Sequence, residues 1–290
     1  MTDAKAVVVD EEALLPDALR ADRRRFVCHE IYDAADWYDV DYAAYRGELN
    51  FYRLLLGRHA RGRAVVEIGA GTGRLSLPLC ESGGPEQRFF LHAVEPAPAM
   101  RQRLRDKRDK AGLDDTRLAI EDAYADTFIG PDVAAIGLVI FAFNGVLHLG
   151  SPAELSACLR HIHAKLADDG AVAIDLTPPY WETMLRGSVP WGRIDERIHP
   201  TSGRRFLTCD RSRYEPADRT THIDIRYAYD DASACDPGVQ IALRQHMWTS
   251  PEILQALQDA RFVVDACFGD VDLSSYTEGS PRLLVSAKKA

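Results

Sequence analysis

The chain has 290 residues, of which 46% are hydrophobic, and a formal net charge of −9 at pH 7. This composition fits one large domain or a domain with a sizeable insertion. The acidic balance argues against a surface that follows nucleic-acid phosphates, because such binding needs a basic face. No apolar run approaches the roughly 18 residues of a membrane-spanning helix, and no signal-peptide pattern opens the chain. We therefore expect a cytoplasmic protein that binds neither nucleic acid nor membrane.

Two groups of residues are not interpreted as functional sites. The six cysteines are scattered without a C-x-x-C pair, which disfavours a zinc site and a disulfide framework. The run Arg101 to Lys110 holds six basic residues, but acids interrupt it on a predicted helix, and we interpret it as a solvated outer face.

The first 60 residues are predicted to be a tail followed by helical cover. Residues 1–20 show no sustained period and indicate a loosely docked tail. From Phe26 to Arg58, apolar and aromatic residues recur at helical spacing, which predicts helices packed before the first strand.

Tyrosines and acids are concentrated in this cover. Four tyrosines fall within 14 residues, and we expect one or two of them to face a ligand: Tyr32, Tyr38, Tyr42 and Tyr45. The acids lack the glycine and terminal glutamate of a calcium loop, and are interpreted as surface residues: Asp33, Asp36, Asp39 and Asp41.

Residues 65–73 read Val-Val-Glu-Ile-Gly-Ala-Gly-Thr-Gly, a β-branched strand that ends in a turn on three alternating glycines. Gly69, Gly71 and Gly73 remove Cβ atoms where the backbone turns sharply and lies close to a ligand. Thr72 is predicted to cap the helix that follows. The spacing differs from the G-x-G-x-x-G of nicotinamide and flavin sites, because Arg74 stands where the third glycine would be. A nucleotide-like cofactor is the expected ligand.

Strands and helices then alternate, which predicts a doubly wound, mostly parallel sheet with helices on both faces. The expected elements are strand 63–68, helix 73–82, strand 88–95, helix 97–111, strand 116–120, strand 136–143, helix 152–167 and strand 170–176. This predicts a Rossmann-like core over 61–177.

The alternation stops at Pro178-Pro179. Thr221 to Asp230 alternates between apolar and polar residues, and with 204–214 and 239–248 it predicts an antiparallel insertion spanning 178–248. Thr249-Ser250-Pro251-Glu252 is a helix start with a capping residue and an early proline. Residues 249–290 then return to the core with strands 261–268 and 281–288.

The series E-x-G-x-G-x-G, with Glu67 at its head, resembles the first motif of class I S-adenosylmethionine (SAM) dependent methyltransferases. The resemblance covers roughly residues 30–177 and, more weakly, 249–288. It implies a seven-stranded sheet, SAM as cofactor, and Glu67 and the Gly69 backbone near the amino group of the methionine moiety. Glu95 ends the second strand, where a carboxylate can accept hydrogen bonds from both ribose hydroxyls.

The same resemblance suggests residues for the adenine. Met100 lies five residues past the ribose acid, where this family packs an apolar side chain on the ring. After the third strand, the family places an acid on the adenine amino group and a backbone amide on the ring. Asp122, preferred over Glu121, and Ala123 occupy those positions.

Residues after the fourth strand are expected to contact the cofactor or the substrate. Asn144 stands where the strand opens onto the sulfonium, and its backbone or amide is expected to contact cofactor or substrate. The segment is similar to small-molecule N-methyltransferases of the amino-sugar type, which implies that His148 faces the substrate. An imidazole with a pKa of about 6.5 can take a proton from an ammonium or hydroxyl near neutral pH. Related enzymes use an aromatic hydroxyl from the N-terminal cover, and Tyr38 is the candidate here.

The sequence predicts an enzyme that transfers a methyl group to a small molecule, with an amine slightly preferred and oligomeric state left open. The magnesium ligands of catechol-type O-methyltransferases are missing, because Asn144 and Asp175-Leu176-Thr177 replace them, so we expect no metal. Asn144-Gly145-Val146-Leu147 also departs from the Asn-Pro-Pro-Tyr tetrad of nucleobase and glutamine amide methylation. An O- or C-methyltransferase of specialised metabolism, and a SAM-binding protein without transfer activity, are the alternatives.

Overall fold

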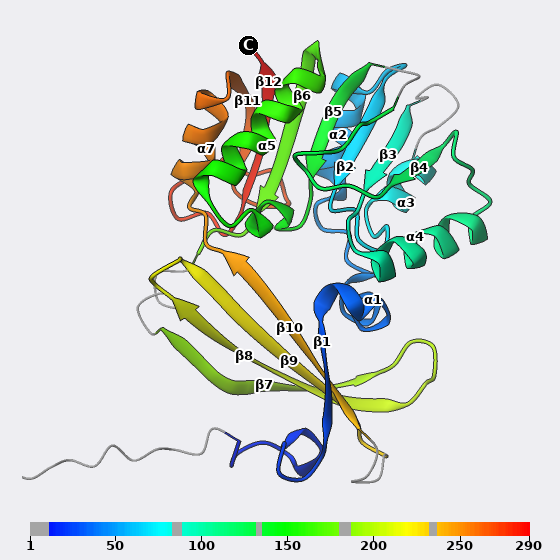
Figure 1. Cartoon of the computed structure of the whole chain (residues 1–290), viewed down its shortest axis with the longest axis vertical. Coiled ribbons are helices and arrows are strands. Elements are labelled where there is room, and N and C mark those ends of the chain that lie inside the picture. Colours follow the sequence, from blue (N-terminus) through cyan, green and yellow to red (C-terminus); the bar gives the residue numbers. More distant parts are fainter. Residues whose placement is uncertain (1–11, 83–88, 132–134, 180–186, 232–236) are drawn as a thin grey trace, which may run out of the picture. The chain divides into compact units, whose positions relative to one another are not determined.

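The computed structural model describes residues 12–82, 89–131, 135–179, 187–231 and 237–290. The chain divides into two compact units. The α/β unit comprises residues 32–180 and 245–290, and the second unit comprises residues 1–31 and 181–244. Each unit contains one sheet (Figure 1).

The α/β unit is built on a seven-stranded sheet of order β11-β12-β6-β5-β2-β3-β4. Strand β12 pairs antiparallel with both β11 and β6, and the other neighbouring strands pair parallel, so the sheet is mostly parallel, as the sequence predicts. The strands are β2 (Ala64–Ile68), β3 (Phe90–Val94), β4 (Leu118–Glu121), β5 (Ile136–Phe141), β6 (Leu166–Leu176), β11 (Phe262–Phe268) and β12 (Leu283–Lys289).

Helices pack on both faces of this sheet because successive residues of the buried strands point in opposite directions. Val66 belongs to the core shared with α5 (Pro152–Lys165) and α7 (Ser250–Asp259). Its neighbour Val65 belongs to the opposite core, which contains residues of α2 (Leu49–His59), α3 (Ser76–Ser82) and α4 (Pro98–Lys110). This arrangement places the ends of the parallel strands at one edge, where their loops can form a site.

The helix starts follow local chemistry in two cases and depart from it in one. Thr249 forms a reciprocal capping box with Glu252 at the start of α7, as predicted. Ser151 caps α5 by accepting from the Glu154 N–H. The helix expected from residue 73 begins only at Ser76, so Thr72 is not its cap.

The second unit contains a five-stranded sheet of order β1-β10-β9-β8-β7. Its strands are β1 (Phe26–Glu30), β7 (Ser188–Ile198), β8 (Arg205–Glu215), β9 (Thr220–Tyr229) and β10 (Gly238–His246). Strands β7, β8 and β9 pair antiparallel, whereas β1 pairs parallel to β10.

The structure corrects two predictions for the N-terminal region. Residues 26–30 form strand β1, and the first α-helix is α1 (Ala35–Tyr42), preceded by the short helix η2 (Ile31–Asp33). Strand β1 forms because β10 offers it hydrogen-bond partners from residue 238 onwards. The segment before it is also docked: Leu19, in the short helix η1 (Asp17–Leu19), is fully buried and its carbonyl accepts from Arg226. The predicted tail at residues 1–11 lies outside the described residues.

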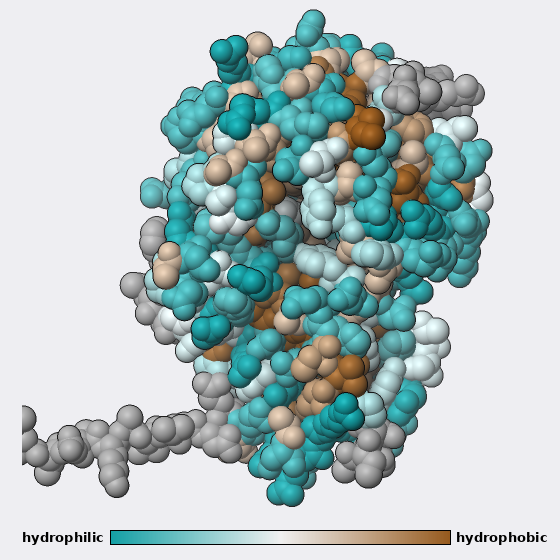
Figure 2. Space-filling view, viewed as in Figure 1, coloured by the Kyte–Doolittle hydropathy of each residue, from teal (hydrophilic) through white to brown (hydrophobic). Residues whose placement is uncertain are grey.

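Hydrophobic side chains are largely sequestered in these cores. The face in Figure 2 is mainly hydrophilic, with hydrophobic residues in scattered patches. Within the described ranges, no helix combines the length and apolar character needed to cross a membrane.

Candidate active site

The glycine turn between β2 and α3 combines left-handed backbone with open space. Gly69, Gly71 and Gly73 have φ values of 68°, 57° and 81°, which L side chains rarely adopt. The Gly69 and Ala70 N–H groups donate to the Val94 carbonyl and fix the turn to the end of β3. A Cβ built on Gly69 would have no heavy atom of the described residues within 4 Å, apart from its chain neighbours. A Cβ on Gly73 would overlap the Leu104 side chain, so this glycine permits close packing of α4.

Glu95 lies directly beside the turn. It follows β3, is 4% exposed, and its carboxylate accepts from the Gly71 and Ala97 N–H groups, both at 2.8 Å. Burial raises the pKa of Glu95, and the two backbone donors oppose that shift. The acid that the sequence predicts for the ribose is therefore held at the glycine turn.

The two acids after β4 differ in their surroundings. The Glu121 carboxylate is occupied by His92 Nε2 at 2.5 Å and by the Ile129 N–H at 2.7 Å. Asp122 is 67% exposed at its side chain and accepts from Arg101 Nη2 at 2.7 Å. Asp122 is the more exposed of the two acids, and its contact with an adenine remains a prediction.

Two further predicted adenine contacts lie close by in the sequence. Ala123 is half-buried against the core of α5 and α7. Met100 is fully buried in α4, so its side chain is enclosed by protein. Their contacts with an adenine remain predictions.

Glu67, the last acid before the turn, is almost completely buried. Its side chain accepts a 2.5 Å hydrogen bond from Ser76 Oγ at the start of α3. Burial raises its pKa to about 7, although Ser76 and Arg74 favour the carboxylate. Glu67 therefore titrates near neutral pH.

A buried ion pair involves Arg74, the residue that follows the glycine turn. Arg74 Nη1 lies 2.5 Å from Glu48 Oε1, and both side chains are at most 5% exposed. The guanidinium also lies 4.5 Å from the centre of the Phe143 ring. Burial raises the pKa of Tyr38, while Arg74 acts in the opposite direction. The sequence suggested Tyr38 but gave no sign of the Glu48–Arg74 pair.

The loop after β5 is shaped by two consecutive left-handed residues. Phe143 and Asn144 have φ values of 48° and 66°. Asn144 Oδ1 accepts from the Thr177 N–H at 2.6 Å, and the Asp175 carbonyl accepts from the Asn144 N–H at 2.9 Å. Asn144 thus joins the ends of β5 and β6, and its contact with cofactor or substrate remains a prediction.

His148 ends the short helix η3 (Gly145–His148) and is exposed. Its Nε2 lies 2.6 Å from the Tyr32 hydroxyl, and the two rings meet edge to face with centroids 5.3 Å apart. Of the four tyrosines that the sequence singles out, Tyr32 is thus the hydrogen-bond partner of the predicted base. No spacing in the sequence relates these positions, which lie 116 residues apart.

The structure corrects the interpretation of Asp39 and of the basic run. The Asp39 side chain is 9% exposed and accepts from Thr72, Arg103 and Lys107. Arg101 is also buried and donates to the Glu95 and Pro96 carbonyls. Asp39 is therefore not a surface acid, and Arg101 and Lys107 are mostly buried, whereas the Arg103 side chain is paired with Asp39 but 38% exposed. Arg103 and Lys107 are four residues apart and so lie on one helix face, and this spacing was the sequence signal that both could bind one acid.

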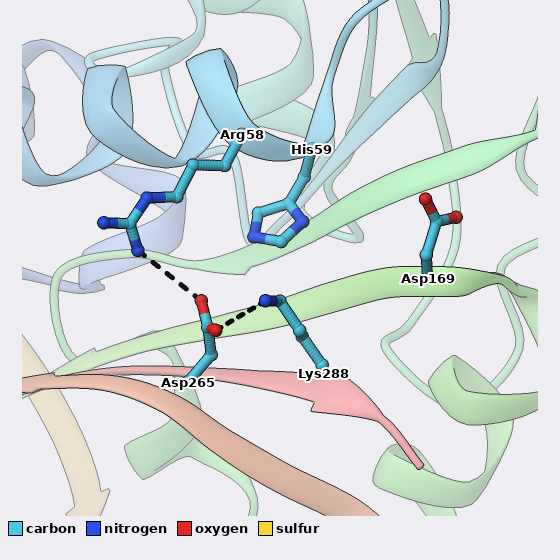
Figure 3. A pocket seen from close by; sticks show the side chains of 5 residues that line it. All are labelled: Arg58, His59, Asp169, Asp265 and Lys288. Carbon is cyan, nitrogen blue, oxygen red and sulfur yellow. Dashed lines mark hydrogen bonds and ion pairs between the residues drawn. The ribbon is translucent and has the colours of Figure 1, made fainter.

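A separate surface hollow lies beside the end of α2 and the strand edge opposite the glycine turn. Figure 3 shows Arg58 and Lys288 pointing to the carboxylate of Asp265, with His59 and Asp169 completing the lining. The Asp265 carboxylate neutralises part of the basic charge, and burial lowers the pKa of His59. Across the described part of the chain, no three His, Cys, Asp or Glu side chains are grouped so that they could hold a metal ion.

Comparisons with known proteins agree with this geometry. Residues 65–170 match a family model described as a methyltransferase domain. No curated protein matches the chain. Among solved structures, the CcbJ methyltransferase from Streptomyces caelestis is similar, with a TM-score of 0.67, 17% identity, and coverage of 87% of this chain and 96% of that one.

Two other solved structures show the same fold. The sugar N-methyltransferase KedS8 from Streptoalloteichus sp ATCC 53650 has a TM-score of 0.62 and 19% identity, covering 87% of this chain and 92% of that one. SAM-bound CalS10, an amino pentose methyltransferase from Micromonospora echinaspora, has a TM-score of 0.60 and 21% identity, covering 92% and 100%. The chain therefore carries a methyltransferase domain over residues 65–170, within an α/β fold that it shares with solved methyltransferases.

Proposed function

We propose that this protein is a SAM-dependent methyltransferase that transfers a methyl group to an amine of a small molecule. The observation that carries the proposal is the glycine turn, which has open space at Gly69 and a buried acid on each side, Glu67 and Glu95. The match of the same residues to a methyltransferase domain supports it.

The residues around the turn fit the chemistry of SAM. Glu95, held by the Gly71 and Ala97 N–H groups, would accept from the ribose hydroxyls. Glu67 and the Gly69 backbone would face the amino group of the methionine moiety. The pKa of Glu67 stays raised although Arg74 favours the carboxylate, so a further positive charge such as an ammonium would offset the remaining desolvation of the carboxylate.

The adenine and the reacting end would be held by residues from later loops. Met100, Asp122 and Ala123 are the proposed adenine contacts, and Asn144 is proposed to lie near the reacting end. When bound, SAM supplies an activated methyl group on a sulfonium. The protein's own task is to align the acceptor, exclude water and remove a proton.

Proton removal is assigned to His148. Its imidazole is exposed and its Nε2 lies 2.6 Å from the Tyr32 hydroxyl, which restrains the ring. A neutral imidazole can accept the proton of an ammonium or hydroxyl acceptor near neutral pH. Tyr38, close to Gly71, is proposed as a second hydroxyl at the site.

The amine is favoured because the fold is similar to a sugar N-methyltransferase and to an amino pentose methyltransferase. Transfer to oxygen or carbon is the competing function, since the same cofactor site would serve it equally well. Turnover on matched amine and hydroxyl forms of a candidate small molecule, with the product identified by mass spectrometry, separates the two.

Replacement of His148 tests the chemistry. His148→Ala should lower turnover by about 10²-fold or more with SAM affinity nearly unchanged, because general bases contribute about 10²–10⁴. The ascending limb of the pH–rate profile should be absent in the His148→Ala variant. His161→Ala is the control. His161 Nε2 hydrogen-bonds to the Phe128 carbonyl, so any loss of turnover in this variant should match its loss of folding stability. A variant of His148 that keeps the rate and the limb would exclude its role as base.

A further inference from the structure

Asp39 connects helix α1 to the glycine turn and to α4. Its carboxylate accepts from Thr72 Oγ1 at 2.6 Å and Lys107 Nζ at 2.6 Å through one oxygen, and from Arg103 Nε at 2.7 Å through the other. Lys107 Nζ also donates to Thr72 Oγ1 at 3.1 Å. The carboxylate, the hydroxyl and the two cations therefore form one connected polar cluster.

This cluster lies at the turn itself. Thr72 stands between Gly71 and Gly73, so Asp39 bonds to a residue of the cofactor loop and not only to its surroundings. Tyr38, the preceding residue of α1, lies with its ring 3.9 Å from the position that a Cβ on Gly71 would take. Two adjacent residues of α1 thus hold the helix against successive residues of the turn.

Helix α1 depends on contacts with the rest of the α/β unit. Of its eight residues, all in the described part of the chain, Ala35 alone is buried, and its N-cap residue Ala34 forms no side-chain cap. A helix this short gains little from its own hydrogen bonds and depends on tertiary anchors. Charge-assisted hydrogen bonds to a mostly buried carboxylate are stronger than hydrogen bonds between neutral groups. The Asp39 cluster is therefore one anchor of α1, beside the Arg103–Asp36 ion pair and the contact of the Tyr42 ring with Phe143.

We propose that Asp39 is a positioning residue that latches α1 over the glycine turn and so prolongs the residence of the bound cofactor. The inference rests on the proposed function for the identity of the ligand, but the latch itself is a property of the chain. Without the Asp39 contacts, α1 can move away from the glycine turn and take Tyr38 with it. This movement opens the cofactor loop.

Asp39→Asn is the first test, because it keeps the shape and the hydrogen bond from Thr72 but removes the charge that holds Arg103 and Lys107. Dissociation of S-adenosylhomocysteine, measured by stopped-flow competition, should accelerate about tenfold, the effect of losing a charge-assisted hydrogen bond. High salt should accelerate dissociation from the wild type more than from the variant, since the ion pairs are partly exposed. Asp33→Asn, an equal charge change at an exposed residue before α1, should leave the rate unchanged.

Hydrogen exchange of the α1 amides gives a readout that needs no cofactor. Exchange over residues 35–42 should rise in Asp39→Asn and not in Asp33→Asn, while the amides of β2 and β5 stay protected. If exchange rises but S-adenosylhomocysteine does not bind the wild type, the latch is supported and the proposed function is refuted. If the ligand binds and the wild type and Asp39→Asn show equal dissociation rates and equal α1 exchange, the latch is overturned.

Discussion

The buried carboxyl of Glu67 makes the stability of this protein depend on pH in a way that one substitution should remove. Burial raises its pKa from 4.5 to about 7. Between these values the folded chain holds a proton that the unfolded chain has released, so stability is present at low pH and falls as pH rises through the folded pKa. Each pH unit in this window costs about 1.4 kcal/mol, which gives about 3 kcal/mol over the whole window.

Glu67→Gln should abolish that loss. Glutamine is nearly isosteric with the protonated acid, and its carbonyl can still accept from Ser76. Urea unfolding followed by circular dichroism should show similar stabilities for variant and wild type at pH 4.5, with the variant more stable by about 3 kcal/mol at pH 8. Comparing the two proteins cancels the contributions of Glu95 and Asp175, whose pKa values burial also raises.

Glu278→Gln, at an exposed position, is the matched control and should follow the wild type at every pH. Parallel stability profiles for Glu67→Gln and the wild type between pH 4.5 and 8 would refute the reasoning. Such a result would mean that Ser76 and Arg74 compensate the burial of the carboxylate fully.

Two predictions concern the cofactor and metal dependence. Glu95→Ala should weaken SAM binding by about 1.5–3 kcal/mol, the value of a hydrogen bond to a charged group; calorimetry showing unchanged affinity would count against Glu95 as the ribose ligand. Turnover should persist in excess chelator, because the sequence lacks the acid pair and asparagine of catechol-type enzymes; a strict magnesium requirement that added metal restores would contradict the site proposed here.

Much of the α/β unit could be predicted from sequence because its signals are local. Continuous apolar runs mark the buried strands, and three alternating glycines mark a turn whose left-handed backbone only glycine adopts readily. The cap at Thr249 depends on residues within one helical turn. Even the position of Glu95 beside the turn follows from the parallel order of β2 and β3, whose carboxyl ends meet at one edge.

The tertiary structure decided what depends on partners distant in the chain. Helical spacing from Phe26 onwards could not reveal that residues 26–30 pair with β10, because strand pairing depends on the partner's exposed backbone groups. Thr72 looks like a cap in isolation, yet its hydroxyl donates to Asp39, 33 residues away. In both cases, the local preference is small compared with the hydrogen bonds and ion pairs that folding brings together.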